Sequence, residues 1–340
     1  MRNVVLRLET ADGLVGWGEA CPWPVFTGTA EAAAAALDVH LRPLVTGADP
    51  RRISDIMARA DRILVGHGDA KAALEMALFD ILGKASGLSV SELLGGRCRD
   101  RVPLSVSLAN PDFAADQDLA RRLVADGVRI VKVKTGFADH AFDVTRLEWL
   151  RGNMPPDMRI RIDYNQGMAP HEALRRLRDM EAFAPDFIEQ PVPAKEWAAM
   201  AHYTAVLDTP IMADESVFTV ADAVRAAGAR IADLFSIKVM KSGGMRRGQE
   251  IAAVAAGAGI ACYGGDMFET GLAHLAGLHM AAATPNISLG AEFYQAKYYV
   301  AHDLLAQPFP IDGGEMVVPT GPGLGYEVDE DRLAEFAAGF

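Results

Sequence analysis

Residues 160–165 read IRIDYN, a short apolar run that ends in an acid and an amide. A short apolar run that ends in at least one acid returns at residues 187–191, FIEQP, and at residues 211–216, IMADES. Short apolar runs separated by segments with helical spacing are typical of buried strands that alternate with helices. The chain contains eight such runs: Leu104–Leu108, Ile130–Lys134, Ile160–Asn165, Phe187–Pro191, Ile211–Ser216, Leu234–Met240, Ile260–Gly265 and Ser288–Tyr294. This alternation predicts an α/β fold, a parallel (β/α)8 TIM barrel.

The first hundred residues follow another pattern. Two alternating runs, Val4–Glu9 and Leu14–Glu19, flank a glycine-containing turn and predict a β-hairpin. Apolar residues at helical spacing then predict three helices, over Ala30–Leu41, Arg52–Arg62 and Ala70–Lys84. Pro43 should lie just beyond the end of the first of these helices.

The change of pattern near residue 100 divides the chain. We predict an α+β capping domain over residues 1–100 and the barrel over residues 101–312. The remaining segment, residues 313–340, has no barrel strand left to supply, so we expect it to return to the capping domain.

Charge and composition argue against several classes of protein. The 340 residues carry a net charge of −12 and no Lys/Arg-rich run, so we expect no nucleic-acid partner. No apolar stretch reaches the roughly 20 residues that span a bilayer, and the N-terminus does not resemble a signal peptide. Three cysteines, odd in number and far apart, favour a reducing cytoplasm over a disulfide framework.

Polar residues at the strand ends mark the predicted active site, because TIM barrels place their catalytic residues there. Asp163, Glu189 and Asp214 end three consecutive strands. Neighbouring strands lie about 4.8 Å apart, so these acids would repel one another unless a cation lay among them. Any one of them could instead cap a helix or pair with an arginine, but all three in succession favour Mg²⁺, or Mn²⁺, as a cofactor.

Lysines flank this arc of acids. Lys132 and Lys134 share one face of the second strand, and Lys238 belongs to the sixth, which is opposite in a ring of eight. Like charges side by side should lower a lysine pKa toward the range useful for acid–base catalysis. Lys238 could instead extend its amine to solvent at a strand end. A metal beside two opposed lysines suits an enolate formed next to a carboxylate.

The strand-end motifs, taken together and in order, resemble a known family. VKVKTG, RIDYNQ, FIEQP, IMADES, FSIKVMKSGG and CYGGDMFETG, with ELLGGRCRD and PTGPGLG, resemble the muconate cycloisomerase (muconate lactonizing enzyme)-like subgroup of the enolase superfamily. The resemblance covers nearly the whole chain. It implies a capping domain over the barrel mouth, a small carboxylate substrate and a homo-oligomer. It also implies conversion of cis,cis-muconate to muconolactone, or racemisation, epimerisation or dehydration through the same enolate.

The resemblance also implies roles for individual residues. Asp163, Glu189 and Asp214 would bind magnesium. Lys134 and Lys238 would be the general acid and base, and Lys132 would assist Lys134 electrostatically. Two further residues would lie on the substrate side, namely Asn165 and Glu292.

The sequence departs from the family pattern after the seventh and eighth strands. Asp266 stands where the family usually has threonine, Glu269 follows it, and the eighth strand continues with Phe293. We expect all three to contact substrate, with Asp266 pairing with a cationic group such as an amino-acid ammonium. Asp266 could instead cap a helix, since Met267 onward reads helical. The resemblance also implies that the chain begins within the second strand of the capping domain, so we expect the family's usual first strand and mobile loop to be missing from this sequence.

Two other interpretations of the site compete with the enolate chemistry. Lys238 would suit a Schiff-base aldolase, but the three carboxylates argue against it. A non-catalytic binding protein on the same fold would not need the full set of acids and lysines. His274 and His279 lie five residues apart, a poor spacing for sharing a ligand on a helix, so we expect neither in the site.

Overall fold

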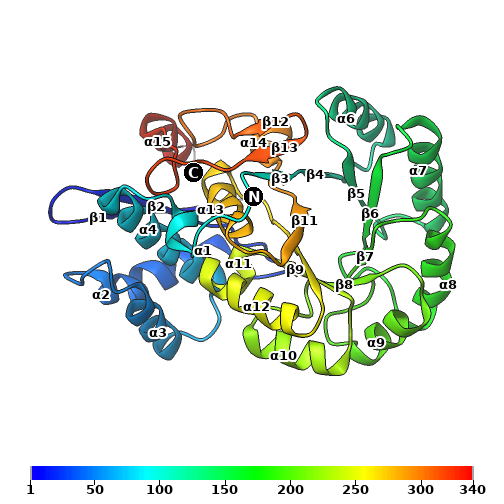
Figure 1. Ribbon diagram of the computed structural model, residues 1–340, viewed down its shortest axis with the longest axis horizontal. Helices are drawn as coiled ribbons and strands as arrows, with labels where there is room; N and C mark the ends of the chain where they lie inside the picture. The colour runs from blue at the N-terminus through cyan, green and yellow to red at the C-terminus, as the bar shows by residue number, and fades with distance from the viewer. Residues whose placement is uncertain (1, 339–340) are drawn as a thin grey trace.

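A barrel of eight parallel strands forms the centre of the computed structural model, which describes residues 2–338 (Figure 1). The strands are β4 (Ser105–Leu108), β5 (Ile130–Lys134), β6 (Arg159–Asp163), β7 (Ile188–Glu189), β8 (Ile211–Ala213), β9 (Leu234–Ile237), β10 (Ala261–Gly264) and β11 (Ile287–Ala291). Each pairs in parallel with the next, and a single bridge between Leu104 and Ala291 connects the first strand to the last. The predicted barrel is therefore confirmed and nearly closed.

Helices on the outside connect the strands (Figure 1). They are α6 (Phe113–Ala125), α7 (His140–Asn153), α8 (Pro170–Glu181), α9 (Trp197–Val206), α10 (Val220–Ala229), α12 (Met245–Gly257) and α13 (Gly271–Ala282), with short α11 (Val239–Ser242) and α14 (Gln295–Tyr298). Side chains of Asp112, Asp139 and Thr219 accept hydrogen bonds from first-turn amides and so fix where α6, α7 and α10 begin.

The capping domain packs a hairpin on a long helix. The hairpin joins β1 (Val4–Glu9) to β2 (Val15–Ala20), and α4 (Gly68–Ser86) lies across β2. A Cβ at Gly18 would clash with the carbonyl oxygen of Ala73, so only glycine permits this close approach. The other helices are α1 (Ala30–Ala35), η1 (Ala36–Leu41), α2 (Arg42–Val45), α3 (Ile53–Ile63) and α5 (Val90–Leu93).

The first helical segment does not end before Pro43. It continues through η1, a π-helix, into α2, which contains Pro43 in its first turn. A proline ring opposes the carbonyl four residues earlier, and the wider π turn lies where this conflict would arise. The expected helix end at Leu41 was therefore wrong.

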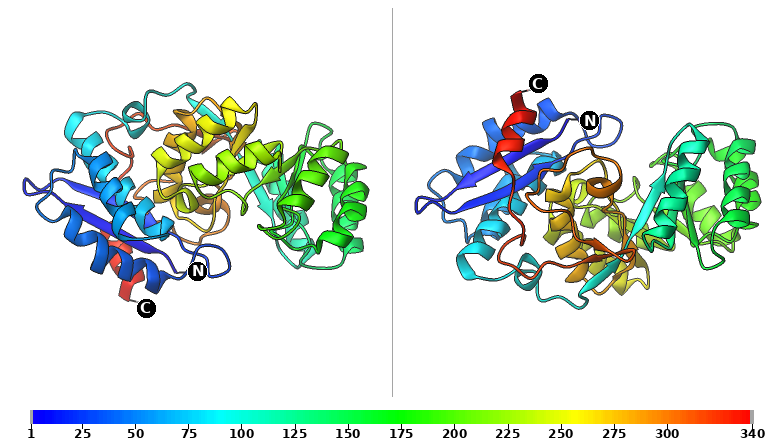
Figure 2. Two further views of the ribbon diagram at one scale, coloured as in Figure 1. Left: turned by 90° about the horizontal axis from the view of Figure 1, so that it is seen from below. Right: turned by 90° about the horizontal axis from the view of Figure 1, so that it is seen from above.

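The C-terminal segment crosses from the barrel to the capping domain. β12 (Ile311–Asp312) and β13 (Glu315–Val317) form a small antiparallel sheet with β3 (Arg101–Pro103) at the start of the barrel. The amide of Leu324 then donates to Asp80 on α4, at 2.9 Å. The last helix, α15 (Glu330–Ala338), lies beside the hairpin in both views of Figure 2.

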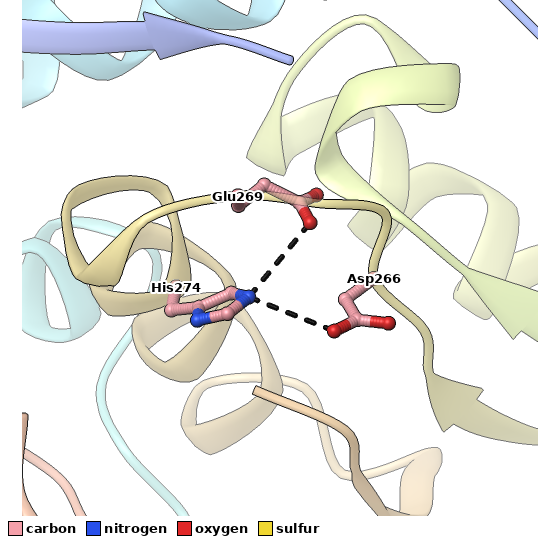
Figure 3. Close-up of side chains that lie close together, drawn as sticks. All are labelled: Asp266, Glu269 and His274. Atoms are coloured by element: carbon pink, nitrogen blue, oxygen red, sulfur yellow. Dashed lines mark ion pairs between the residues drawn. The ribbon is translucent and has the colours of Figure 1, made fainter. Parts of the chain in front are cut away.

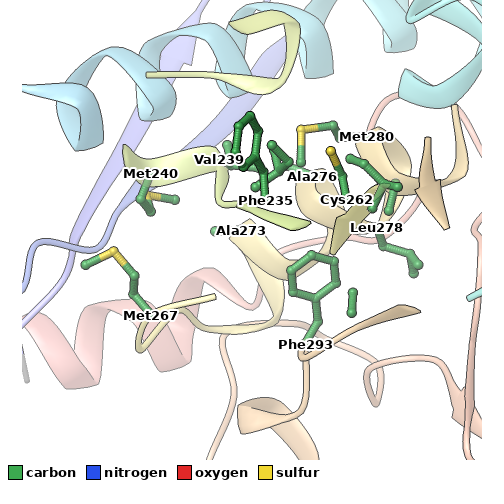
Figure 4. Close-up of a cluster of buried hydrophobic side chains, with 14 of the residues drawn as sticks. Phe235, Val239, Met240, Cys262, Met267, Ala273, Ala276, Leu278, Met280 and Phe293 are labelled. Atoms are coloured by element: carbon green, nitrogen blue, oxygen red, sulfur yellow. The ribbon is translucent and has the colours of Figure 1, made fainter. Parts of the chain in front are cut away.

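The larger hydrophobic core runs through both domains, and a smaller cluster is formed by Phe187, Met212 and Tyr263. The part of the larger core around β9, β10 and α13 includes Phe235, Cys262, Met267 and Phe293 (Figure 4). The three cysteines are free thiols. None of the helices that the structure describes combines the length and apolar character needed to cross a membrane.

Candidate active site

The three predicted acids lie side by side on one arc of the barrel rim. Asp163 ends β6 and pairs in register with Glu189, which ends β7; Asp214 follows directly on β8. All three are almost completely buried. Burial, reinforced by the neighbouring Asp163, raises the pKa of Glu189 to about 8.

Lys132 neutralises part of this charge. Its amine lies 2.9 Å from Glu189 Oε2, 2.7 Å from Glu292 Oε1 and 3.2 Å from Asp163 Oδ2. Burial alone would lower the pKa of Lys132, but the three carboxylates outweigh burial and raise it well above its ordinary value. We expected crowding by Lys134 to lower a lysine pKa here; for Lys132 that was wrong, because carboxylates rather than another ammonium surround it.

Lys134 and Lys238 stand on opposite sides of the arc. Lys134 ends β5 and Lys238 follows β9, so three strands separate them on either side of the ring. The Lys134 amine contacts Asp163 and donates to Asn165 Oδ1 at 2.9 Å, whereas the Lys238 amine lies 2.6 Å from Asp214 Oδ2. Lys238 is buried, not extended to solvent. Two amines therefore face one another with the acids between them.

The arc fits a divalent cation. Oε1 of Glu189 is buried and has no hydrogen-bond partner among the described residues, so one carboxylate oxygen is left for a ligand. Oxygen donors from three adjacent strands are the ligand set that Mg²⁺ accepts. The residues that would hold such an ion are Asp163, Glu189 and Asp214.

Residues beyond the sequence prediction hold this arrangement in place. Lys241, on α11, donates to both the carbonyl and the carboxylate of Asp214, at 2.6 and 2.8 Å. Gln190 accepts the amide of Asp214 at 3.0 Å, and its own backbone has a φ of 33°. Glu215 is buried beside Asn165, and burial raises the pKa of Glu215 to about 7. Their positions next to strand ends were the available signal.

A second group of titratable side chains lies after β10. His274 Nε2 stands 3.7 Å from Asp266 Oδ2 and 3.7 Å from Glu269 Oε2, and all three side chains are buried (Figure 3). His274 belongs to α13, and sequence reasoning had placed it outside the site. Burial lowers the pKa of His274, but the two carboxylates outweigh burial and raise it to about 9.

The loop that carries Asp266 is not helical. α13 begins only at Gly271, with Thr270 as its N-cap, so the reading of a helix from Met267 and of Asp266 as its cap was wrong. The loop is held from outside instead: Gln295 donates to the Met267 carbonyl at 2.8 Å and Asn3 to the Phe268 carbonyl at 2.9 Å.

Of the two remaining candidate substrate-binding residues, Glu292 lies in the site and Phe293 lies in the hydrophobic core. Glu292 follows β11, contacts Lys132, and keeps Oε2 buried without a partner in the described chain. Phe293 lies in the hydrophobic core, against Gly277 of α13 and 5.3 Å from the His274 ring (Figure 4). A substrate contact of Phe293 therefore stays a prediction.

A loop of the capping domain brings aromatic side chains to the site. The ring of Phe26 lies 4.7 Å from the Lys238 amine and stacks on Phe218 at 5.2 Å. Trp23 stacks on Phe26 and meets Phe268 edge-on at 5.4 Å. Aromatic side chains thus cover the side of the barrel mouth on which Lys238 lies.

Comparisons with known proteins agree with this geometry. Residues 1–95 match the Mandelate racemase / muconate lactonizing enzyme, N-terminal domain, and residues 115–332 match the Enolase C-terminal domain-like family. L-Ala-D/L-Glu epimerase of Bacillus subtilis is 35% identical over 95% of this chain and 88% of the epimerase. Muconate cycloisomerase 1 of Acinetobacter baylyi is 32% identical over 98% and 91% of the two chains.

Solved structures give the same result. The crystal structure of a muconate cycloisomerase from Azorhizobium caulinodans has a TM-score of 0.89 and 49% identity, covering 98% of this chain and 92% of that one. Muconate lactonizing enzyme from Pseudomonas putida reaches a TM-score of 0.94 at 32% identity, covering 98% and 94%. The chain therefore belongs to the mandelate racemase/muconate lactonizing enzyme family and is an isomerase-type enzyme of the enolase superfamily.

Proposed function

We propose that the protein transfers a proton at the carbon next to a substrate carboxylate, with Lys134 and Lys238 acting from opposite faces. The observation that carries this proposal is the pair of opposed amines, each in contact with an acid of the arc between them. Asp163, Glu189 and Asp214 would bind Mg²⁺, with Mn²⁺ as a substitute. The bound ion would stabilise the negative charge that develops on the carboxylate when the neighbouring C–H bond breaks.

One lysine takes a proton from the substrate carbon and the other lysine gives a proton back to it. A neutral lysine removes the proton and becomes an ammonium group. The opposite lysine, charged beforehand, gives its proton to the same carbon from the other face and becomes neutral. The product of these two steps is the epimer, and either lysine can begin. Lys132 holds Glu189 and Glu292 in place throughout.

Cycloisomerisation is the second net reaction that the same residues support. A carboxylate oxygen of cis,cis-muconate would add to a double bond of the same molecule, and one lysine would protonate the adjacent carbon to give muconolactone. The muconate cycloisomerases among the relatives favour this reaction, whereas the buried Asp266 favours a cationic substrate and so an epimerase or dehydratase.

Two assays on one set of variants test the proposal. Muconate consumption is followed by ultraviolet absorbance, and exchange of the proton next to the carboxylate by proton NMR in D₂O. Lys134→Ala and Lys238→Ala should each lower the rate by about 10²–10⁴-fold, and each should abolish exchange for a different stereoisomer. Lys195→Ala, at an exposed position, is the matched control.

A Schiff-base aldolase would give different results in two measurements. Borohydride added with substrate would trap a covalent adduct on Lys238, detectable as a mass increase, and chelation would leave such an enzyme active. An adduct, or full activity of either lysine variant, would contradict the proposal.

A further inference from the structure

Asp266 directly follows a residue that packs against Lys238. The preceding residue, Gly265, is so close to Lys238 that a Cβ there would stand 2.9 Å from Lys238 Cε. On its other side, the amide of Asp266 is 3.4 Å from Glu292 Oε1. A substrate group bound by Asp266 would therefore be near the carbon from which Lys238 takes its proton.

The charge around Asp266 is negative. Glu269 and Glu292 are buried close to it, and burial together with the charge of Glu269 raises the pKa of Asp266. Lys132 already serves three carboxylates. A second substrate carboxylate in this position would add to the repulsion.

No guanidinium offsets that repulsion in the described part of the barrel interior. The two fully buried arginines contact other groups: Arg146 donates to Asp116 at 2.8 Å, and Arg161 donates to the carbonyl of Leu289 and to Asp186, with Nη1 left unpartnered. A dicarboxylate would thus find no arginine beside Asp266 for its second charged group.

His274 does not neutralise all the negative charge of Asp266 and Glu269. Its Nε2 faces both Asp266 and Glu269, and a single imidazolium charge balances only one of the two carboxylates (Figure 3). The Asp266 oxygen that faces His274, Oδ2, is buried without a hydrogen-bond partner, as is His274 Nε2. The ligand atoms of the three side chains lie within 4.8 Å of one another, a spacing that suits one shared cation.

We propose that Asp266 binds a positively charged nitrogen on the carbon that Lys238 deprotonates, so that the substrates are α-amino acids with a free cationic nitrogen. This inference rests on the proposed function and narrows its substrate class. The nitrogen would complement the excess negative charge, and its proximity would acidify the C–H bond. His274 is a positioning residue that fixes the Asp266 carboxylate.

The substrate test compares matched compounds. The common L-α-amino acids, their N-acetyl derivatives and cis,cis-muconate are incubated with the magnesium-loaded enzyme in D₂O. The N-acetyl derivatives keep the carboxylate and side chain but lack the cation. We expect deuterium at the α-carbon of at least one free amino acid, and at least tenfold slower exchange in its N-acetyl form.

The variant test uses the amino acid that exchanges. Asp266→Asn should raise KM for it at least tenfold, and Asp266→Glu should restore part of that loss. Glu148→Gln, which changes an exposed acid on α7, is the control for a general change of charge. Thermal unfolding of each variant shows whether it is folded.

Four outcomes would overturn the inference. Reaction of N-acetyl derivatives or muconate without any free amino acid would remove it and leave the proposed function standing. A folded Asp266→Asn variant with unchanged KM would do the same, as would Zn²⁺ or Mn²⁺ bound at a second site that the variant loses. If no compound exchanges or reacts, the proposed function fails as well.

Discussion

The amine of Lys132 lies 2.7 Å from Oε1 of Glu292, a contact that ties β5 to the end of β11 across the intervening β4. Neither side chain is accessible to solvent to any useful extent. Removing either partner would leave a buried charge without compensation, so the stability of the fold depends strongly on this ion pair.

Lys132→Met should destabilise the protein strongly for this reason. Three buried carboxylates would lose their common ammonium, at a cost of about 3–5 kcal/mol in the free energy of unfolding. Urea unfolding measures the loss, with Lys134→Met as control because its side chain is 26% exposed. Saturating Mg²⁺ should reduce the difference; equal losses for the two variants would show that burial of Lys132 does not matter.

Magnesium affinity should rise with pH. The pKa of Glu189 is raised to about 8 by burial and its acidic neighbours, so the metal must displace a proton below that pH. We expect affinity to increase by up to about tenfold per pH unit between pH 6.5 and 8, and to level off above it. Calorimetric titration at several pH values measures this, and Glu189→Gln should remove the slope. If the Mg²⁺ affinity of the unchanged protein did not vary with pH, the assignment of Glu189 as a metal ligand would be wrong.

His274→Gln should change how stability depends on pH. The raised pKa of about 9 means that the native protein binds this proton more tightly than the unfolded chain does. The resulting stability, of order 3 kcal/mol, is present below pH 6.5 and is lost as pH rises through 9. The difference in unfolding free energy between the two proteins should therefore shrink from pH 7 to pH 10. A constant difference would mean that His274 is neutral in the fold.

Gly18→Ala should separate the hairpin from α4. The added methyl group would meet the Ala73 carbonyl, and overpacking against backbone costs about 1–3 kcal/mol or more. Gly152→Ala, on α7, meets nothing within 4 Å and should be neutral or slightly stabilising. Thermal unfolding compares the two; similar midpoints would show that the hairpin moves freely.

Much of the candidate active site could be predicted from the sequence because its residues recur with each β/α unit of the fold. Asp163, Glu189 and Asp214 each end one strand of a β/α unit, so the spacing that predicts the barrel also places them together. Lys134 and Lys238 are opposite for the same reason, since a ring of eight strands fixes which positions face one another. For these five residues, the sequence pattern that predicts the strands also predicts where the side chains lie in the site.

The region after β10 shows what the sequence could not supply. Met267 to Thr270 read as helical, but Asn3, Glu19 and Gln295, distant in the chain, hold this stretch as a loop. His274 joins Asp266 and Glu269 only because the loop folds back over α13, which no spacing along one helix reveals.

The sequence by itself thus determined the barrel, the arc of acids and the opposed lysines, because strand periodicity sets all three. Only the tertiary structure decided the protonation of Lys132, the charge beside Asp266 and the place of His274. The energies of buried charges depend on which groups surround them in space, and those groups come from separate parts of the chain.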